Sequence, residues 1–106
     1  MSINQDSTAL IVRNFELETD TSTVNEEELL RLLTERIAYM IEHKLDFLLS
    51  LLYRLDVDEG KINFALSPLA PDPPAVGLAK LVMERQRQRL ATKEKYRQKD
   101  SDEWDW

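Results

Sequence analysis

The stretch that decides the fold is NEEELLRLLTERIAYMIEHKLDFLLSLLYRL, residues 25–55. In its first part, apolar residues recur at intervals of three and four, the period of an amphipathic helix. These residues are Leu30, Leu33, Ile37 and Ile41. Asn25 is a good N-cap, and Glu28 follows it at the spacing of a capping box. The pattern therefore predicts a helix that begins near residue 26.

The second part, LDFLLSLLYRL at residues 45–55, is apolar around most of its circumference. Eight of its 11 residues are apolar, and such a helix is either central in its domain or covered by another subunit. No glycine or proline interrupts residues 26–55, so one helix and two helices are both compatible with the pattern. We favour a break or sharp kink at residues 43–46, where Asp46 could cap a second helix.

The same segment predicts a homodimer. A chain of 106 residues has few elements with which to cover a helix that is apolar all round. The residues expected at the dimer interface are Phe47, Leu48, Leu51, Leu52 and Leu55.

Residues 8–18, TALIVRNFELE, are rich in β-branched and aromatic types and weakly favour a strand. A lone strand is not stable, and we find no second strand for it to pair with. The alternatives are an extended arm that lies on the helices, an arm that pairs with another chain, and a disordered terminus. We interpret residues 1–24 as an N-terminal arm and linker.

Residues 56–67 predict a short third helix. Asp56, Asp58 and Gly60 invite comparison with a calcium loop, but an EF-hand needs glycine at its sixth position and a carboxylate at its twelfth. Counted from Asp56, the fifth residue is Gly60 and the twelfth is Ser67. An N-cap for the short helix is therefore the better interpretation of Asp56 or Asp58.

Four prolines in residues 68–74 form a stiff connector into a last helix at residues 74–98. Pro74 suits the first turn of that helix. About 25 helical residues run roughly 37 Å, which exceeds the width of a domain this small. We therefore expect the C-terminal half of the helix to project or to lie across another subunit. The helical domain as a whole spans residues 25–98.

Charge is unevenly spread along the chain, because residues 1–60 carry 5 basic and 13 acidic side chains whereas residues 80–99 carry 8 and 2. Four basic residues spaced by four would form one stripe on the last helix: Arg85, Arg89, Lys93 and Arg97. The stripe could pair with the acidic first helix, within the chain or across a dimer. It could also bind an acidic protein or the phosphates of a nucleic acid. An isoelectric point near 4.8 argues against nucleic acid.

Residues 99–106, KDSDEWDW, form an acidic tail with two tryptophans, Trp104 and Trp106. Tryptophan is a typical anchor residue in protein interfaces. Such a segment could dock into a basic pocket with an apolar floor, or fold back onto the basic helix of its own chain.

Composition favours an all-α fold. With 106 residues the chain is long enough for one domain, and 42% hydrophobic with 32% charged residues is typical of a globular protein. A sheet-rich fold needs many tight turns, and glycine and proline are the residues that most often form them. The chain has only two glycines and four prolines, which argues against such a fold. We predict a bundle of three to four helices, with an extended N-terminal arm and a long basic C-terminal helix.

Few residues could carry chemistry. There is no cysteine, His43 is the only histidine, and no glycine-rich phosphate loop is evident. We therefore expect no catalytic residues, no metal site and no cofactor. The first residues lack a secretory signal, and no apolar run approaches the roughly 20 residues of a membrane span. These features favour the cytoplasm and no membrane contact.

The run RIAYMIEHKLDFLLSLLYRLDV, together with GLAKLVMERQRQRLATKEKYRQ, resembles a group of small bacterial helical proteins. The shared features are a Leu-Tyr-Arg-x-Asp-Val segment and a helix with Glu-Arg-Gln, within about residues 26–98. The resemblance implies an all-helical fold and no particular activity.

Taken together, these features predict a non-enzymatic module for protein–protein interaction or assembly. The alternative is a nucleic-acid-associated protein that uses the basic helix, with the acidic tail as a competitor of the nucleic acid.

Overall fold

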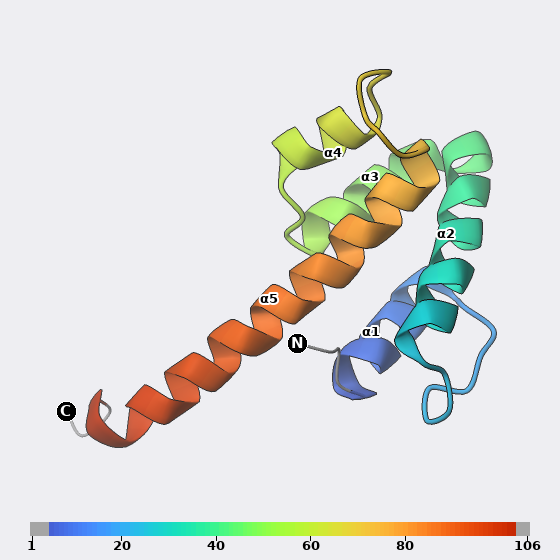
Figure 1. Ribbon diagram of the computed structural model, residues 1–106. Coiled ribbons are helices and arrows are strands. Elements are labelled where there is room, and N and C mark those ends of the chain that lie inside the picture. The colour runs from blue at the N-terminus through green and yellow to red at the C-terminus, as the bar shows by residue number, and fades with distance from the viewer. Residues whose placement is uncertain (1–4, 104–106) are drawn as a thin grey trace.

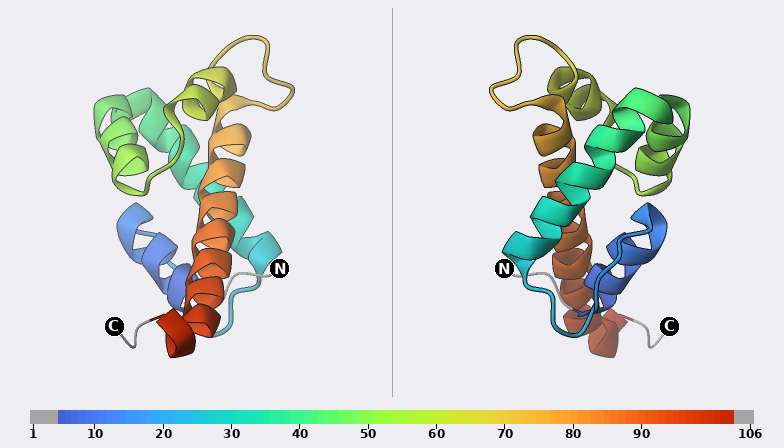
Figure 2. Two further views of the ribbon diagram at one scale, coloured as in Figure 1. Left: turned by 90° about the vertical axis from the view of Figure 1, so that its left-hand side faces the viewer. Right: turned by 90° about the vertical axis from the view of Figure 1, so that its right-hand side faces the viewer.

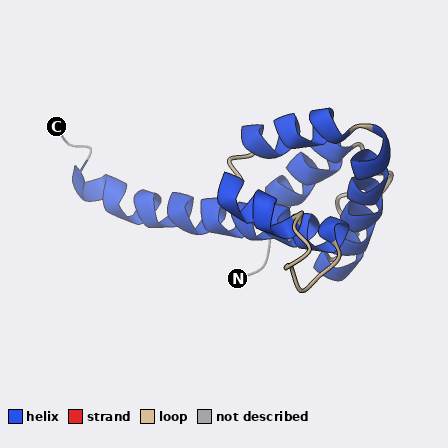
Figure 3. Ribbon diagram, turned by 90° about the horizontal axis from the view of Figure 1, so that it is seen from above, coloured by secondary structure: helices blue, strands red, loops and turns tan. Residues whose placement is uncertain are grey.

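The computed structural model describes the backbone of residues 5–103 and the side chains of residues 7–88. Five helices and no strand occur within that range (Figures 1 and 3). The helices are α1 (Gln5–Phe15), α2 (Glu26–His43), α3 (Leu45–Arg54), α4 (Glu59–Ala65) and α5 (Pro74–Glu103). The all-α prediction is confirmed, with five helices in place of three to four.

The long helix α5 is the axis around which the others gather. Its most extensive contact is with α2, and α4 lies against its N-terminal part. The helices α2 and α3 form a hairpin. The helix α1 packs against α2 (Figures 1 and 2). The C-terminal half of α5 extends beyond the other helices, which gives the molecule extents of 50 × 32 × 23 Å. Within the single chain the C-terminal half of α5 thus projects, and its contact with another subunit stays a prediction.

One hydrophobic core joins all five helices. It includes Ile11 from α1, Leu33 and Ile37 from α2, Leu48 and Leu52 from α3, Ile62 from α4, and Leu78 and Val82 from α5. None of these side chains is more than 1% exposed.

The start of α2 follows the predicted pattern, because the Asn25 side chain accepts a hydrogen bond of 2.7 Å from the backbone N–H of Glu28. The buried face of α2 is rotated slightly from the expected one. Its centre is formed by Leu29, Leu33, Ile37 and Met40, whereas Leu30 and Ile41 are only partly buried. The helical period of the apolar residues was therefore predicted correctly. At each end of the helix, however, the fully buried residue is the one before the residue predicted: Leu29 rather than Leu30, and Met40 rather than Ile41.

The break between α2 and α3 is confirmed at Lys44. This residue has φ −145° and ψ 46°, outside helical geometry, and it separates α2 from α3. Its N–H still donates to the Met40 carbonyl, at 2.7 Å, so the first helix closes its last turn before the chain changes direction. No side chain caps α3, so Asp46 does not take the capping role proposed for it.

The extended-arm interpretation of residues 1–24 is wrong for the described part, since residues 5–15 form α1. Thr8, Ile11 and Phe15 are all buried and are spaced by three and four. Burial of this helical face outweighs the β-propensity of the individual residues, which is a weak and context-dependent preference. The backbone of Glu16 then turns left-handed, with φ 55°, and ends the helix.

The helices α1 and α3 end with the same hydrogen-bond pattern. In α1 the N–H groups of Leu17 and Glu16 donate to the carbonyls of Val12 and Arg13. In α3, those of Val57 and Asp56 donate to Leu52 and Tyr53. This is the Schellman motif, in which one residue adopts a left-handed conformation. Asp56, with φ 62°, takes that position and ends α3.

The dimer interface predicted on residues 47–55 is not available in this fold. The side chains of Leu48, Leu51, Leu52 and Leu55 are buried within the single chain, at no more than 5% exposure. The reason is that α2 folds back on α3, and α4 and α5 complete the core around it. Of the five residues, Phe47 alone stays accessible, at 48%.

The last helix is longer than predicted. It begins at Pro74 as expected and runs to Glu103 rather than to residue 98, so the first five residues of the predicted tail have a helical backbone. Trp104 and Trp106 lie outside the described residues.

Candidate functional site: an apolar pocket between α4 and α5

An open pocket of about 390 Å³ lies where α4 meets the first turns of α5 and the proline-rich connector. Its lining is Asp58, Gly60, Lys61, Phe64, Ala65, Ala70, Pro71, Asp72, Gly77, Lys80 and Leu81. The surface inside is mostly apolar. A volume of this size falls in the range of ligand and side-chain binding pockets, about 300–1,000 Å³.

The pocket exists because small residues line it. The chain has two glycines, and both Gly60 and Gly77 contribute to the lining, together with Ala65 and Ala70. Neither glycine has a positive φ, so neither is required by a left-handed backbone. What these four positions share is the absence of a side chain beyond the β-carbon, which leaves the space open.

Each glycine also has a local steric reason. A β-carbon on residue 77 would lie 3.3 Å from the Cβ of Ala65, so α4 and α5 are in close contact at this position. A β-carbon on residue 60 would lie 3.1 Å from Oδ2 of Asp58. That oxygen accepts a hydrogen bond of 3.0 Å from the Lys61 N–H and caps α4. The predicted N-cap is thus confirmed for Asp58.

The proline-rich connector forms one wall of the pocket through Ala70 and Pro71. It is fastened at both ends. The Ser67 hydroxyl donates to the Phe64 carbonyl at 2.8 Å, and Lys80 of α5 forms an ion pair of 3.1 Å with Asp72. A connector that is stiff and fastened holds its wall in place before any ligand arrives.

The rim carries charges of both signs, and most of them are engaged. Asp72 and Lys80 neutralise each other, and Asp58 is held by the first turn of α4. Lys61 is exposed and forms no ion pair within the described part of the chain. The rim therefore offers one cation beside an apolar cavity.

Two large apolar side chains of α4 and the connector are exposed. Phe64, which lines the pocket, is 52% exposed, and Leu69, which precedes the lining residue Ala70 in sequence, is 82% exposed. An apolar pocket flanked by exposed apolar side chains is typical of a surface that another molecule covers.

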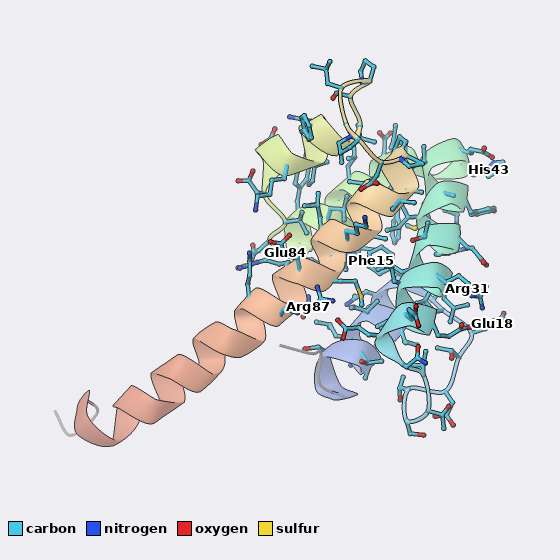
Figure 4. All side chains as sticks on the ribbon, in the orientation of Figure 1. Phe15, Glu18, Arg31, His43, Glu84 and Arg87 are labelled. Carbon is cyan, nitrogen blue, oxygen red and sulfur yellow. The ribbon has the colours of Figure 1, made fainter. Side chains whose placement is uncertain are left out.

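Exposed aromatic residues form a second surface on α2 and α3. The rings of Tyr39 and His43 lie 4.6 Å apart, and the Arg36 guanidinium lies 5.1 Å from the Tyr39 ring centroid. His43 points outward at the end of α2 (Figure 4). Phe47 and Tyr53 on α3 are also about half exposed.

Among the described residues, no group of three or more histidine, aspartate or glutamate side chains is placed to hold a metal ion. No helix in the described part of the chain has the length and apolar character of a membrane span.

The shifted pKa values belong to exposed networks away from the pocket. Arg31 lies between Glu28 and Glu35 on α2 and pairs with both. Hydrogen bonding to Arg31 lowers the pKa of Glu28, and hydrogen bonding to Glu28 raises that of Arg31. In the loop before α2, hydrogen bonds from Ser22 lower the pKa of Asp20.

The residues of the predicted basic stripe are only partly described. Arg85 is half-buried and lines a second, smaller groove next to the pocket. Its Nε is buried and has no hydrogen-bond partner among the residues whose side chains are described. Arg89, Lys93 and Arg97 lie on the described backbone of α5, but their side chains, like Trp104 and Trp106, lie outside the described residues.

One basic residue of α5 does pair with the acidic first part of the chain. Arg87, which lies beside the predicted stripe, forms an ion pair with Glu26 at the start of α2. Figure 4 shows Arg87 on the side of α5 that faces α2. At this one position, the basic helix pairs within its own chain.

Sequence reasoning missed the pocket. Its signal was the placement of the only two glycines, at 60 and 77, near a run of prolines. Finding the pocket from that signal would have required knowing that α4 packs on the start of α5.

No protein-family model, curated protein or solved structure matches this chain. Its function must be argued from the chemistry of its own surfaces.

Proposed function

We propose that this protein is a non-enzymatic protein-binding module whose pocket between α4 and α5 receives a large apolar or aromatic side chain of a partner. The observation that carries the proposal is the pocket itself, an open apolar cavity of about 390 Å³ with Phe64 in its wall. An open, mostly apolar pocket with a few charged groups at its rim is the usual form of a binding site.

The energetics fit a modest interaction. An aromatic side chain buries about 150–250 Å², worth roughly 4–6 kcal/mol before the costs of association are subtracted. A single anchor would therefore bind weakly, and contacts to Leu69 and Lys61 would add to its affinity. The Asp72–Lys80 ion pair holds the connector against α5, so one wall of the pocket is already formed. A pre-formed wall lowers the entropic cost of ordering the pocket when a partner binds.

The absence of cysteine is compatible with a role in the reducing cytoplasm, where we place the protein. Catalysis is not part of the proposal. The lining combines lysines, aspartates and apolar groups, with no hydroxyl or imidazole to serve as nucleophile or base.

The experiment is an NMR titration with N-acetyl-tryptophanamide. Because both glycines of the chain line the pocket, their backbone amides are two reporters of its occupancy. We expect the resonances of Gly60 and Gly77 to shift in a saturable manner. Ala70→Phe, which fills the pocket from the connector, should abolish the shifts, whereas Tyr39→Ala on the distant aromatic surface should leave them unchanged.

The proposal would be contradicted if the exposed aromatic residues of α2 and α3 shift while the Gly60 and Gly77 resonances stay unchanged. Unchanged spectra with the amide and with leucine- and phenylalanine-bearing analogues would contradict it as well.

A second candidate is binding of nucleic acid along the projecting part of α5. The observation that favours it is the helical backbone that runs past the body of the molecule to Glu103 and carries basic residues at intervals of four. Binding of this kind loses affinity steeply with salt. Retention on a polyanion column that disappears on Arg89→Glu with Lys93→Glu would support it. Equal retention of the variant would exclude it.

A further inference from the structure

We infer that the occupant of the α4–α5 pocket is the tryptophan-bearing segment at residues 100–106 of a second copy of this chain. The inference rests on the proposed function, because it assigns a partner to the same pocket. Its basis is the chemistry of that segment, its reach, and the charge of the region around the pocket.

The segment has the chemistry that the pocket would recognise. Residues 100–106 contain two tryptophans and four acidic residues. An indole fills an apolar cavity and carries one N–H donor for a rim carboxylate. The acidic neighbours of the indole suit the cation that the rim leaves unpaired, Lys61. The two tryptophans of this segment are the only ones in the chain.

Charge at the rim offers one partner for the acidic residues of the segment. The lining carries Asp58 and Asp72 against Lys61 and Lys80, and Asp72 is already paired with Lys80. Lys61 forms no ion pair within the described part of the chain. An acidic residue beside the docked indole can therefore pair with Lys61.

Geometry excludes the same chain as the donor. From Leu81 in the pocket, α5 continues for 22 residues to Glu103, a distance of roughly 33 Å. The three residues 104–106 reach at most about 11 Å beyond the helix end. Figure 1 shows the C-terminal half of α5 leading away from α4. Because the segment cannot return to its own pocket while α5 is helical, a tryptophan that docks there must come from another molecule.

In this arrangement two copies would associate through the α4–α5 pocket and residues 100–106. The residues of α3 predicted to form the dimer interface would not take part. Leu48, Leu51, Leu52 and Leu55 stay in the core of each chain. Each molecule carries one pocket and one donor segment, so two copies can close a reciprocal dimer or many can associate head to tail.

The experiment separates donor from acceptor. The acceptor is the ¹⁵N-labelled double variant Trp104→Ala, Trp106→Ala, which keeps its pocket and cannot donate a tryptophan. The donor is the unlabelled unmodified chain. We expect the Gly60 and Gly77 resonances of the acceptor to shift with increasing donor, and to stay in place when the unlabelled double variant is added instead.

A second acceptor variant tests the rim. Lys61→Glu reverses the charge of the unpaired lysine in the lining, and should weaken donor binding by roughly two- to fivefold, the effect of one exposed ion pair. The matched control is Arg13→Glu, an exposed charge reversal on α1, which should leave binding within twofold of the unmodified acceptor.

The outcomes distinguish this inference from the function on which it rests. If N-acetyl-tryptophanamide shifts the two glycines and millimolar donor does not, the second-copy inference is wrong and the proposed pocket stands. If neither ligand shifts them, both are wrong. A last comparison uses the labelled unmodified chain and the labelled double variant, both at high dilution. If their Gly60 and Gly77 resonances already differ, the tryptophans dock within one chain. That result would overturn the inference.

Discussion

Gly77 of α5 and Ala65 of α4 face each other so closely that a β-carbon on residue 77 would lie 3.3 Å from the Cβ of Ala65. Ala65 is 6% exposed, and both residues line the candidate pocket. This contact sets the separation of the two helices, and the cavity beside it depends on that separation. Larger side chains here would move α4 and the connector apart from α5.

Gly77→Val should therefore destabilise the fold by about 1–3 kcal/mol, the cost of overpacking a close helix contact. Gly77→Ala should be far milder, because the gain in helix propensity of about 1 kcal/mol offsets a slightly tight contact. Urea denaturation followed by circular dichroism measures both. The control is Ala38→Val at an exposed position of α2, expected to cost less than about 1 kcal/mol. If Gly77→Val and Ala38→Val lower the free energy of unfolding equally, the contact between Gly77 and Ala65 is not tightly packed.

Asp56 and Asp58 should respond to substitution with opposite signs. Asp56 has φ 62° and ends α3, so Asp56→Gly relieves a left-handed backbone and should stabilise by about 0.5–1 kcal/mol. Asp58 caps α4, so Asp58→Ala should destabilise by about 1 kcal/mol. Thermal unfolding of the two variants gives the answer directly. Changes of the same sign would contradict the assignment of these two roles.

Phe15→Ala should reveal whether α1 belongs to the core. The side chain is 1% exposed, and removing a buried phenylalanine costs about 3–5 kcal/mol. The expected result is a single unfolding transition at much lower denaturant, because α1 unfolds together with the rest. Arg13→Ala, at an exposed position on the same helix, is the control and should change little. A loss below about 1 kcal/mol would indicate that α1 is a loosely attached arm.

Glu28→Gln should make stability less sensitive to acid. Hydrogen bonding to Arg31 lowers the pKa of Glu28 below its ordinary value of 4.5. The stabilisation is therefore present above pH 4.5 and is lost as the pH falls through the folded-state pKa. The variant should be less stable than the unmodified protein at pH 7, with a gap in the free energy of unfolding that narrows as the pH falls below 4.5. A gap that is constant from pH 7 to pH 3 would show that the Glu28–Arg31 pair has no part in acid stability.

Gln86→Leu should be neutral or stabilising, by up to about 1 kcal/mol. Gln86 is 3% exposed, and its Nε2 is buried with no hydrogen-bond partner among the described side chains, residues 7–88; an unpaired buried amide carries a desolvation cost. Gln88→Leu, on the exposed face of the same helix, should have little effect. Hydrogen–deuterium exchange and chemical denaturation measure the difference. A loss of more than 1 kcal/mol would mean that Gln86 has a partner in solution, such as a bound water.

Much of the fold could be predicted because its signals are local. The Asn25 cap, the break at Lys44 and the start of α5 at Pro74 each depend on a few neighbouring residues. The helix α1 could not be predicted in the same way. Its β-branched residues favour a strand when considered alone, and its helical face becomes meaningful only when Ile11 and Phe15 have a core to enter.

The candidate site was beyond sequence reasoning for a related reason. The apolar residues of α3 predicted a shared interface, because nothing in a linear pattern distinguishes burial by a partner from burial by α2, α4 and α5 of the same chain. The pocket joins Gly60 to Gly77 and to the connector, which come together only after α4 packs on α5. The tryptophans of residues 104 and 106, by contrast, stood out by composition alone.

The central claim, that the α4–α5 pocket binds the tryptophans of a second copy, is tested most directly by intrinsic fluorescence as a function of protein concentration. Both tryptophans of the chain lie in residues 104–106, so their emission reports on the donor segment alone. Emission should move to shorter wavelength as the concentration rises, and Ala70→Phe should suppress that movement while retaining the helical circular dichroism spectrum. Emission at the wavelength of fully solvated indole at every concentration, identical in the two proteins, would contradict the claim.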